Sequence, residues 1–146
     1  MSLINALEWR YATKKFDDTK IISDIEIKKI KAGFNLSASS YGLQPVTMIL
    51  VRNKTIQKEL VEFSMNQKQV YQASHLAIFC VKTSIESTYV IEYFERIKAI
   101  RKTDDKILDS FRTHIIETFS RKSSDDTYLW GAKQAYLAMG NLLAVC

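Results

Sequence analysis

One stretch decides the fold, LSASSYGLQPVTMILV at residues 36–51. Its first part is a turn of small and hydroxyl-bearing residues that ends at Pro45, and such a turn offers free backbone N–H groups to an anion. Its second part, 46–51, is a short apolar run rich in β-branched residues, and residues 76–81 form another. Such runs are typical of strands covered on both faces. We therefore expect two buried strands, with Cys80 packed inside the second as a small hydrophobe.

Patterns typical of helices surround the two expected strands. The first helix covers residues 3–10. The second starts after Ser23, where Asp24 and Glu26 occupy the first turn, and ends near Gly33 or Asn35. The apolar surface of the last helix is so wide that this helix should lie at the centre of the fold. The predicted fold class is α+β, with helices around a small central sheet in one domain of residues 1–146, and the remaining helices are expected over 87–101, 104–120 and 126–145.

The sequence ends in the middle of an apolar helix. Ala144-Val145-Cys146 carries no helix stop signal such as glycine, asparagine or a basic last turn. Two short strands by themselves seldom form a stable sheet in water. We therefore expect that at least one further strand of the working protein lies outside this chain.

Composition and charge narrow the function classes. With 47% hydrophobic and 25% charged residues, the chain has the balance of a soluble globular domain. No run reaches the ~20 apolar residues of a membrane span, and the N-terminus lacks the layout of a signal peptide, so a cytoplasmic location is expected. The net charge of +5 favours anionic partners. Acids are interspersed with the bases, however, and aromatics do not alternate with them, so a nucleic-acid-binding module is only a remote alternative.

Few residues have the pattern of a metal or nucleophile site. Cys80 and Cys146 lack metal-ligand spacing and are expected to be reduced thiols. His75 precedes the second strand, and with no partner at metal spacing it is expected to be a hydrogen-bonded structural histidine. The sequence contains no catalytic triad, metal cluster or paired-carboxylate motif.

The segment Arg10–Phe16 is the clearest candidate for binding. It reads RYATKKF and places three cations within six residues without a carboxylate between them. An arginine fork suits phosphate oxygens, and a lysine ammonium acts as a point charge against a developing anion. The alternative is a basic surface turn. Together with the turn at 36–45, the segment is suited to an anionic ligand such as a phosphate.

Four motifs occur along the chain in one order: residues 10–16, Ala38-Ser39-Ser40 with Gln44-Pro45, Ala73-Ser74-His75 leading into 76–83, and 132–137 with Gly140-Asn141. In this order and spacing the chain resembles the nitroreductase family of FMN-dependent NAD(P)H oxidoreductases, in the branch of oxygen-insensitive nitroreductase and dihydropteridine reductase. The resemblance implies an α+β homodimer with FMN at the subunit interface. It also implies that this chain is the N-terminal two thirds of the usual family length, with the C-terminal part of the domain missing.

The resemblance assigns roles to three residues around the flavin. Arg10 matches the residue that contacts the FMN phosphate. Lys14 matches one beside the pyrimidine edge of the isoalloxazine ring, where an ammonium stabilises the charge of the reduced flavin, so Lys14 is the expected catalytic residue. Asn66 falls where the family has an asparagine that hydrogen-bonds the same edge. The implied mechanism is ping-pong: NAD(P)H reduces FMN and leaves, and a nitroaromatic, quinone or similar small-molecule acceptor then takes the electrons.

The other implied cofactor-binding positions are Tyr11, Ala12, Ser39, Ser40 and Gln69. Ser39 and Ser40 match residues that reach the flavin of the partner subunit. Ala12 stands where close relatives have a serine that touches FMN, and Gln69 stands where a lysine often assists flavin and nicotinamide binding. These departures leave open the alternative of a non-catalytic flavin-binding or dimerisation homologue. The family aromatic that overhangs the flavin corresponds to Phe111 or Phe119, or is absent.

Overall fold

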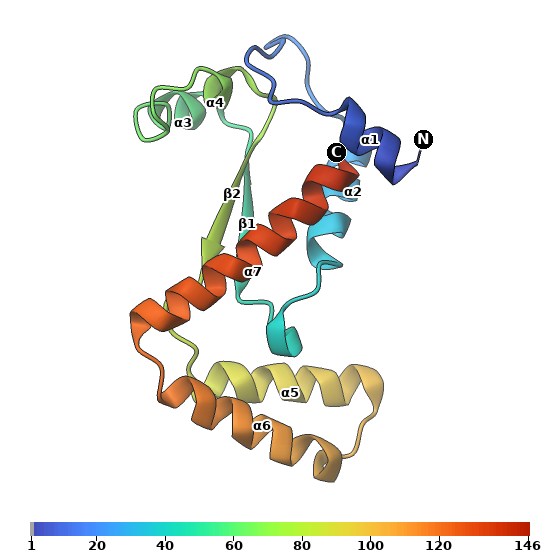
Figure 1. Ribbon diagram of the computed structural model, residues 1–146, viewed down its shortest axis with the longest axis vertical. Coiled ribbons are helices and arrows are strands. Elements are labelled where there is room, and N and C mark those ends of the chain that lie inside the picture. Colours follow the sequence, from blue (N-terminus) through green and yellow to red (C-terminus); the bar gives the residue numbers. More distant parts are fainter. Residues whose placement is uncertain (1) are drawn as a thin grey trace. The chain divides into compact units, whose positions relative to one another are not determined.

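The computed structural model describes residues 2–146, and the order of elements in this range is mixed α and β (Figure 1). Two strands are hydrogen-bonded neighbours in one small sheet. The backbone N–H of Lys82, just after the second strand, donates to the carbonyl of Pro45, just before the first (3.1 Å), so the strands run antiparallel. The elements are α1 (Leu3–Trp9), α2 (Asp24–Asn35), the 3₁₀ turn η1 (Ser40–Gly42), β1 (Val46–Val51), α3 (Lys54–Glu59), α4 (Gln69–Gln72), β2 (Leu76–Val81), α5 (Ser87–Arg101), α6 (Asp105–Ser120) and α7 (Ser124–Val145).

The predicted α+β class is confirmed. Both strands and α5 have the predicted bounds, and α7 begins two residues earlier than expected, at Ser124. Helix α2 starts as the sequence indicates, with a capping box in which the Ser23 hydroxyl accepts from the Glu26 N–H and the Glu26 carboxylate accepts from the Ser23 N–H. The short elements α3, α4 and η1 were not predicted, because they are too short to show an apolar period.

The chain folds into two compact units. The first contains the residues up to Ser37, together with Thr47–Cys80 and Leu137–Cys146. The second contains Ala38–Val46 and Val81–Tyr136. Helix α7 therefore contributes its first part to the second unit and its last part to the first. That the chain is one domain remains a prediction.

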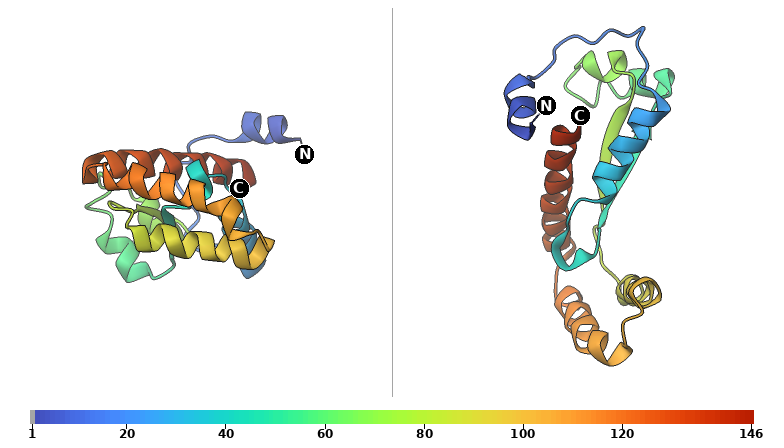
Figure 2. Two further views of the ribbon diagram at one scale, coloured as in Figure 1. Left: turned by 90° about the horizontal axis from the view of Figure 1, so that it is seen from below. Right: turned by 90° about the vertical axis from the view of Figure 1, so that its right-hand side faces the viewer.

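In the first unit, α2 packs on the sheet and on the end of α7. The Phe34 and Phe79 rings lie 6.0 Å apart, which places α2 against β2 (Figure 2). A Cβ added to Gly33 would lie 3.0 Å from a methyl group of Val145, so the end of α7 passes closely over α2. Under β1, the fully buried Gln57 donates to the Val51 carbonyl (3.3 Å), which ties α3 to the end of the strand.

The second unit has the larger apolar core. Helices α5 and α6 lie side by side as an antiparallel hairpin (Figure 1). The aromatic ring of Phe94 meets those of Tyr93 and Phe111 edge-on, at 5.4 and 5.8 Å. Burial of such side chains contributes roughly 1.5–3 kcal/mol each. The core consists of Leu43, Ile85, Val90, Phe94, Ile115 and Phe119.

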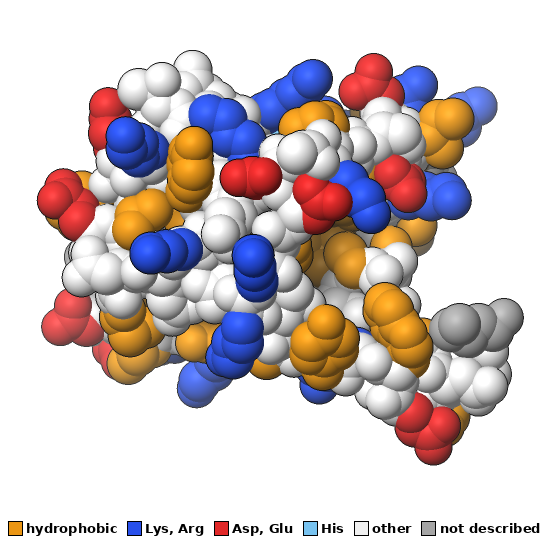
Figure 3. All heavy atoms as spheres, turned by 90° about the horizontal axis from the view of Figure 1, so that it is seen from above, with side chains coloured by type: hydrophobic (Ala, Val, Ile, Leu, Met, Phe, Trp, Pro, Cys, Tyr) orange, Lys and Arg blue, Asp and Glu red, His pale blue; other side chains and the backbone are white. Residues whose placement is uncertain are grey.

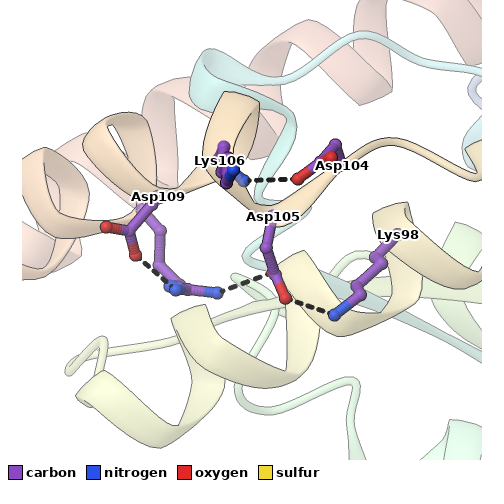
Figure 4. Close-up of polar contacts among 6 residues, drawn as sticks. Lys98, Asp104, Asp105, Lys106 and Asp109 are labelled. Atoms are coloured by element: carbon purple, nitrogen blue, oxygen red, sulfur yellow. Dashed lines mark hydrogen bonds and ion pairs between the residues drawn. The ribbon is translucent and has the colours of Figure 1, made fainter.

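A polar network lies beside the short loop that joins the two helices of this hairpin (Figure 4). Lys98 of α5 donates to the Asp105 carboxylate at the start of α6. Arg112 lies about two turns further along α6. Its guanidinium nitrogens are 3.6 Å from the other carboxylate oxygen of Asp105 and 2.5 Å from a carboxylate oxygen of Asp109. The pKa of Asp105 is lowered chiefly by the hydrogen bond from Lys98. These groups are partly exposed, so we assign them a modest role in stability.

Three expectations about burial are wrong. The strands are not covered on both faces, since Thr47 and Ile49 of β1 and Ala77 of β2 are exposed. Cys80 is an exposed free thiol and not a packed hydrophobe. The apolar surface of α7 is only partly covered, which contradicts a central helix, because Tyr128, Leu129, Tyr136, Leu137, Met139, Leu143 and Val145 are exposed. The composition of an element shows which of its surfaces are apolar, but not what covers them.

Candidate functional site

The basic segment after α1 has no regular secondary structure and is mostly solvent-exposed. Arg10 caps α1 by donating its backbone N–H to the Ala6 carbonyl (3.1 Å), and the chain then leaves the helix. The side chains of Arg10 and Lys14 are exposed, and within residues 2–146 neither makes a hydrogen bond or an ion pair. Seen from above, lysine and arginine side chains are spread over the surface among acidic and hydrophobic ones (Figure 3). The two cations are therefore available to an anionic ligand.

The segment is anchored at its far end to α4. The backbone N–H of Phe16 donates to the side-chain oxygen of Gln72 (3.4 Å). The end of α4 is itself held by Lys54, whose ammonium donates to the carbonyls of Tyr71 (3.0 Å) and Ala73 (2.7 Å). Lys54 thus has a structural role, in contrast to Arg10 and Lys14.

Asn66 and Gln69 lie in the same unit as the basic segment. Asn66 has φ 55°, in the left-handed region that asparagine tolerates better than most residues, and its N–H donates to the Val61 carbonyl (3.0 Å). This turn leaves the Asn66 side chain exposed. Gln69 is the first residue of α4 and is half-buried. The first unit therefore holds Arg10, Tyr11, Ala12, Lys14, Asn66 and Gln69.

Ser39 and Ser40 belong to the second unit, in the turn that contains η1. The Ser39 hydroxyl accepts from the Gln44 N–H (2.9 Å), which leaves its own O–H for another acceptor. The Ser40 N–H donates to the side-chain oxygen of Gln134 (2.8 Å), a buried residue of α7. That these serines share a site with Arg10 remains a prediction.

The turn at residues 39–44 has an unusual backbone. Tyr41, Gly42 and Gln44 have φ values of 58°, 69° and 48°. Two tyrosines of α5 hold its carbonyls: the Tyr93 hydroxyl donates to the Tyr41 carbonyl (3.2 Å), and the Tyr89 hydroxyl donates to those of Leu43 (2.5 Å) and Gln44 (3.1 Å). Sequence reasoning missed Gln134 as a partner of the turn, although it lies in the fourth motif. It also missed Tyr89 and Tyr93, for which no sequence signal was available.

The structure distinguishes between Phe111 and Phe119, the two residues of α6 that could be the aromatic overhanging the flavin. Phe119 belongs to the core and packs edge-on against Trp130 (4.8 Å between ring centroids). Phe111 is 44% exposed and lies 6.2 Å from the Tyr41 ring, beside the turn. Of the two, only Phe111 has a surface free to meet a ligand.

His75 is the structural histidine that the sequence predicts. The Ile22 N–H donates to the Ser74 hydroxyl (2.8 Å), and that hydroxyl lies 2.8 Å from Nδ1 of His75. Burial lowers the pKa of His75, with smaller contributions from the charges of Arg52 and Lys54. A neutral imidazole whose Nδ1 accepts from Ser74 fits all of these observations.

We expect the stability of the protein to fall when His75 is protonated. The folded-state pKa lies below the unfolded value of about 6.5, so the stabilisation is complete above that value and is lost as the pH falls through the folded pKa. Urea unfolding between about pH 8 and 5 measures this slope. His75→Gln should flatten the slope, whereas His114→Gln, at an exposed position of α6, should leave it unchanged. An equal slope in the His75→Gln variant would contradict this role.

Residues 2–146 contain no cluster of three or more histidine, cysteine or acidic residues that could hold a metal ion. In the same range, no helix is long and apolar enough to cross a membrane.

Comparison with known proteins extends over nearly the whole chain. The model of the family described as "Nitroreductase family" matches residues 7–146. The Bacillus subtilis protein YfkO is 30% identical over 149 residues, with 97% of this chain and 67% of YfkO covered. An enzyme of Salmonella typhimurium named oxygen-insensitive NAD(P)H nitroreductase is 26% identical, with 98% and 70% covered.

Solved structures share the fold. A nitroreductase-like protein of Streptococcus mutans superposes with a TM-score of 0.83 at 19% identity, covering 97% of this chain and 68% of that one. A structure from Exiguobacterium sibiricum, determined as a complex with FMN, has a TM-score of 0.82 at 15% identity, covering 99% and 69%. The chain thus spans about two thirds of the length of the proteins it matches.

Proposed function

Because the chain belongs to the nitroreductase family, we propose that it is an FMN-dependent oxidoreductase that takes electrons from NAD(P)H. The similarity to an NAD(P)H nitroreductase of Salmonella typhimurium and the FMN complex from Exiguobacterium sibiricum support this class of reaction. The observation that carries the proposal is the pair of exposed cations, Arg10 and Lys14, in a segment anchored to α4.

The donor set of the first unit fits FMN chemically. Arg10 offers a guanidinium fork for the phosphate, and no carboxylate within residues 2–146 forms an ion pair with it. Lys14 offers a point charge, and the exposed Asn66 amide can both donate to and accept from the edge of a pyrimidine ring. FMN carries all three of the groups that these side chains suit: a phosphate, a ring that becomes negatively charged on reduction, and a pyrimidine edge.

FMN, when bound, supplies the two-electron chemistry, and the protein supplies position and electric field. Arg10 would hold the phosphate, and Asn66 would orient the ring. Lys14 would stabilise the negative charge that the ring edge acquires on reduction. No side-chain nucleophile is required. We propose a ping-pong sequence in which NAD(P)H gives up its hydride and leaves as NAD(P)⁺ before a nitroaromatic, quinone or similar acceptor enters and takes the two electrons.

We further propose that the protein works in the cytoplasm as a homodimer with FMN at the subunit interface. The exposed apolar residues at the end of α7, among them Leu137 (58% exposed) and Leu143 (51%), give a second copy a surface to cover. In such a dimer, Ser39 and Ser40 of one copy would reach the flavin held by the other. Light scattering of the purified protein tests the oligomeric state, and a monomer would contradict this part of the proposal.

Flavin binding and reduction test the proposed activity. The protein should take up added FMN, and stopped-flow mixing with NADH or NADPH should bleach the absorbance of the bound flavin. A colourless protein that takes up no FMN would overturn the proposal. A protein that binds FMN but is bleached by neither donor would instead support the alternative of a non-catalytic flavin-binding homologue.

Lys14→Gln is expected to slow the bleaching of bound FMN about tenfold, because one unit charge near the reduced ring is lost. The rate at saturating NAD(P)H is the relevant measurement, since it separates reduction from binding. Lys15→Gln is the matched control, as Lys15 is the adjacent exposed cation of the same segment. Equal rates in the two variants would contradict the catalytic role of Lys14.

A further inference from the structure

A polar cavity lies within the second unit and has no role in the proposed flavin chemistry. Its volume is about 370 Å³, which falls in the range of small-ligand sites. The cavity is formed where the segment between β2 and α5 meets the segment between α6 and α7. Its walls carry the hydroxyl-bearing residues Thr83, Ser84, Ser87, Ser120, Ser124 and Thr127.

The N-terminus of α5 opens into this cavity. Ser87, the first residue of this 15-residue helix, is part of the wall, and the side chain of the N-cap residue Glu86 makes no capping hydrogen bond. The first-turn N–H groups of α5 therefore have no side-chain acceptor, and the helix dipole adds a partial positive charge at the same place. Such a helix end attracts oxyanions.

Thr127 independently indicates a ligand. Its side chain lines the cavity although the residue is only 3% exposed. Its backbone N–H donates to the Ser123 carbonyl (3.0 Å), but its hydroxyl makes no hydrogen bond within the part of the chain that the structure describes. Its oxygen is not among the fully enclosed polar atoms that lack a partner, so the hydroxyl is open to the cavity. A ligand with acceptor oxygens would satisfy it.

The charges on the wall are one cation and one anion. Lys122 contributes the ammonium, and Glu86 the carboxylate. The apolar side chains of Ile85, Ile116 and Phe119 form the rest of the lining. The cavity is larger than a single tetrahedral oxyanion, so a small organic group attached to one could also be accommodated.

We propose that this cavity binds a phosphate group, either as inorganic phosphate or as part of a small phosphate monoester. The first turn of α5, the Thr127 hydroxyl and the Lys122 ammonium are the donors, and Glu86 weakens the affinity by repulsion. This site belongs to the second unit, whereas Arg10 and Lys14 belong to the first. The inference does not depend on flavin binding.

Titration with inorganic phosphate and, separately, with glycerol phosphate tests the proposal, with Kd measured by calorimetry or by amide chemical shifts. Ionic strength is held constant with chloride because the exposed charges are screened by salt. Saturable binding of either probe, with shifts at Ser87 and Thr127, is expected. Tighter binding of glycerol phosphate would identify a phosphate monoester as the preferred ligand, and equal or tighter binding of inorganic phosphate would identify the free ion. The absence of saturable binding of both would overturn the proposal.

Three substitutions test which side chains of the cavity contribute to phosphate affinity. Lys122→Gln should weaken binding about tenfold and Thr127→Val, which keeps the shape of the side chain, about fivefold. Glu86→Gln should tighten binding about threefold, because it removes the repulsive charge. Lys106→Gln, at an exposed position of α6 outside the cavity, is the matched control and should have no effect.

Lys122→Gln and Glu86→Gln are expected to change the Kd in opposite directions, which makes the test decisive. If neither Lys122→Gln nor Glu86→Gln changed the Kd of phosphate, or if the two changes had the reverse signs, phosphate would bind elsewhere and the proposal would be wrong. Lys122 and Glu86 are both exposed, so these variants keep the test valid even if Thr127→Val does not fold. The same Kd is expected with and without saturating FMN. A Kd that rises with FMN would show that the phosphate occupies the flavin site instead.

Discussion

Replacing Arg10 with alanine is expected to weaken FMN binding about 10- to 100-fold. A hydrogen bond between a charged donor and a phosphate contributes roughly 1.5–3 kcal/mol, and each 1.4 kcal/mol corresponds to a factor of ten. Arg10 makes no competing ion pair within residues 2–146, so none has to be broken when the phosphate binds. The dissociation constant, measured by quenching of FMN fluorescence, gives the size of the effect.

Salt dependence tests whether the contribution of Arg10 is electrostatic, and a matched control tests whether it is specific. The loss should be smaller at high salt, because Arg10 is exposed and its attraction to the phosphate is screened. Arg101→Ala removes another exposed arginine, from the last turn of α5, and should leave the flavin affinity unchanged. If both variants bound FMN as tightly as the parent protein, Arg10 would not be the phosphate ligand.

The strands and the long helices could be predicted from the sequence because their signals are local. The apolar runs at 46–51 and 76–81 are the two strands, and Ser23 with Glu26 forms the capping box of α2. The exposed position of Arg10 and Lys14 likewise agrees with a charge run that no carboxylate interrupts. In each case neighbouring residues are sufficient to explain the structure.

What could not be predicted depends on contacts between distant residues. The bond from Ser40 to Gln134 joins positions 94 residues apart, and no local pattern identifies it. The same holds for the hydroxyls of Tyr89 and Tyr93, which reach the turn from α5. The covering of β1 and α7 was wrongly predicted for a related reason, since the surface that an apolar residue meets is not encoded beside it.

Gly42 lies in the turn at residues 39–44 and is held there in an unusual conformation. Gly42 has φ 69°, a conformation that residues with a Cβ adopt at a cost of roughly 1–2 kcal/mol. A Cβ at this position would also lie 2.3 Å from the Tyr93 hydroxyl oxygen, far inside contact distance. Tyr93 would have to move, and its bond to the Tyr41 carbonyl would be lost.

Gly42→Ala is therefore expected to lower the free energy of unfolding by about 2–3 kcal/mol, the sum of backbone strain and about 1 kcal/mol for the lost hydrogen bond. Urea unfolding measures the change. Gly140→Ala is the matched control: nothing lies within 4 Å of a Cβ there, and because Gly140 is inside α7 the alanine should stabilise the protein by roughly 0.5–1 kcal/mol.

A double-mutant cycle with Tyr93→Phe separates the two causes. The phenylalanine lacks the hydroxyl that clashes, and the next atom of the ring, Cζ, is 3.4 Å from the added Cβ, which is a tolerable contact. In the Tyr93→Phe background, Gly42→Ala should cost only the strain of roughly 1–2 kcal/mol. The difference of about 1 kcal/mol is the coupling between turn and tyrosine. Fully additive effects would show that the Tyr93 hydroxyl does not hold the turn, and that the left-handed backbone of Gly42 is the whole reason for a glycine at this position.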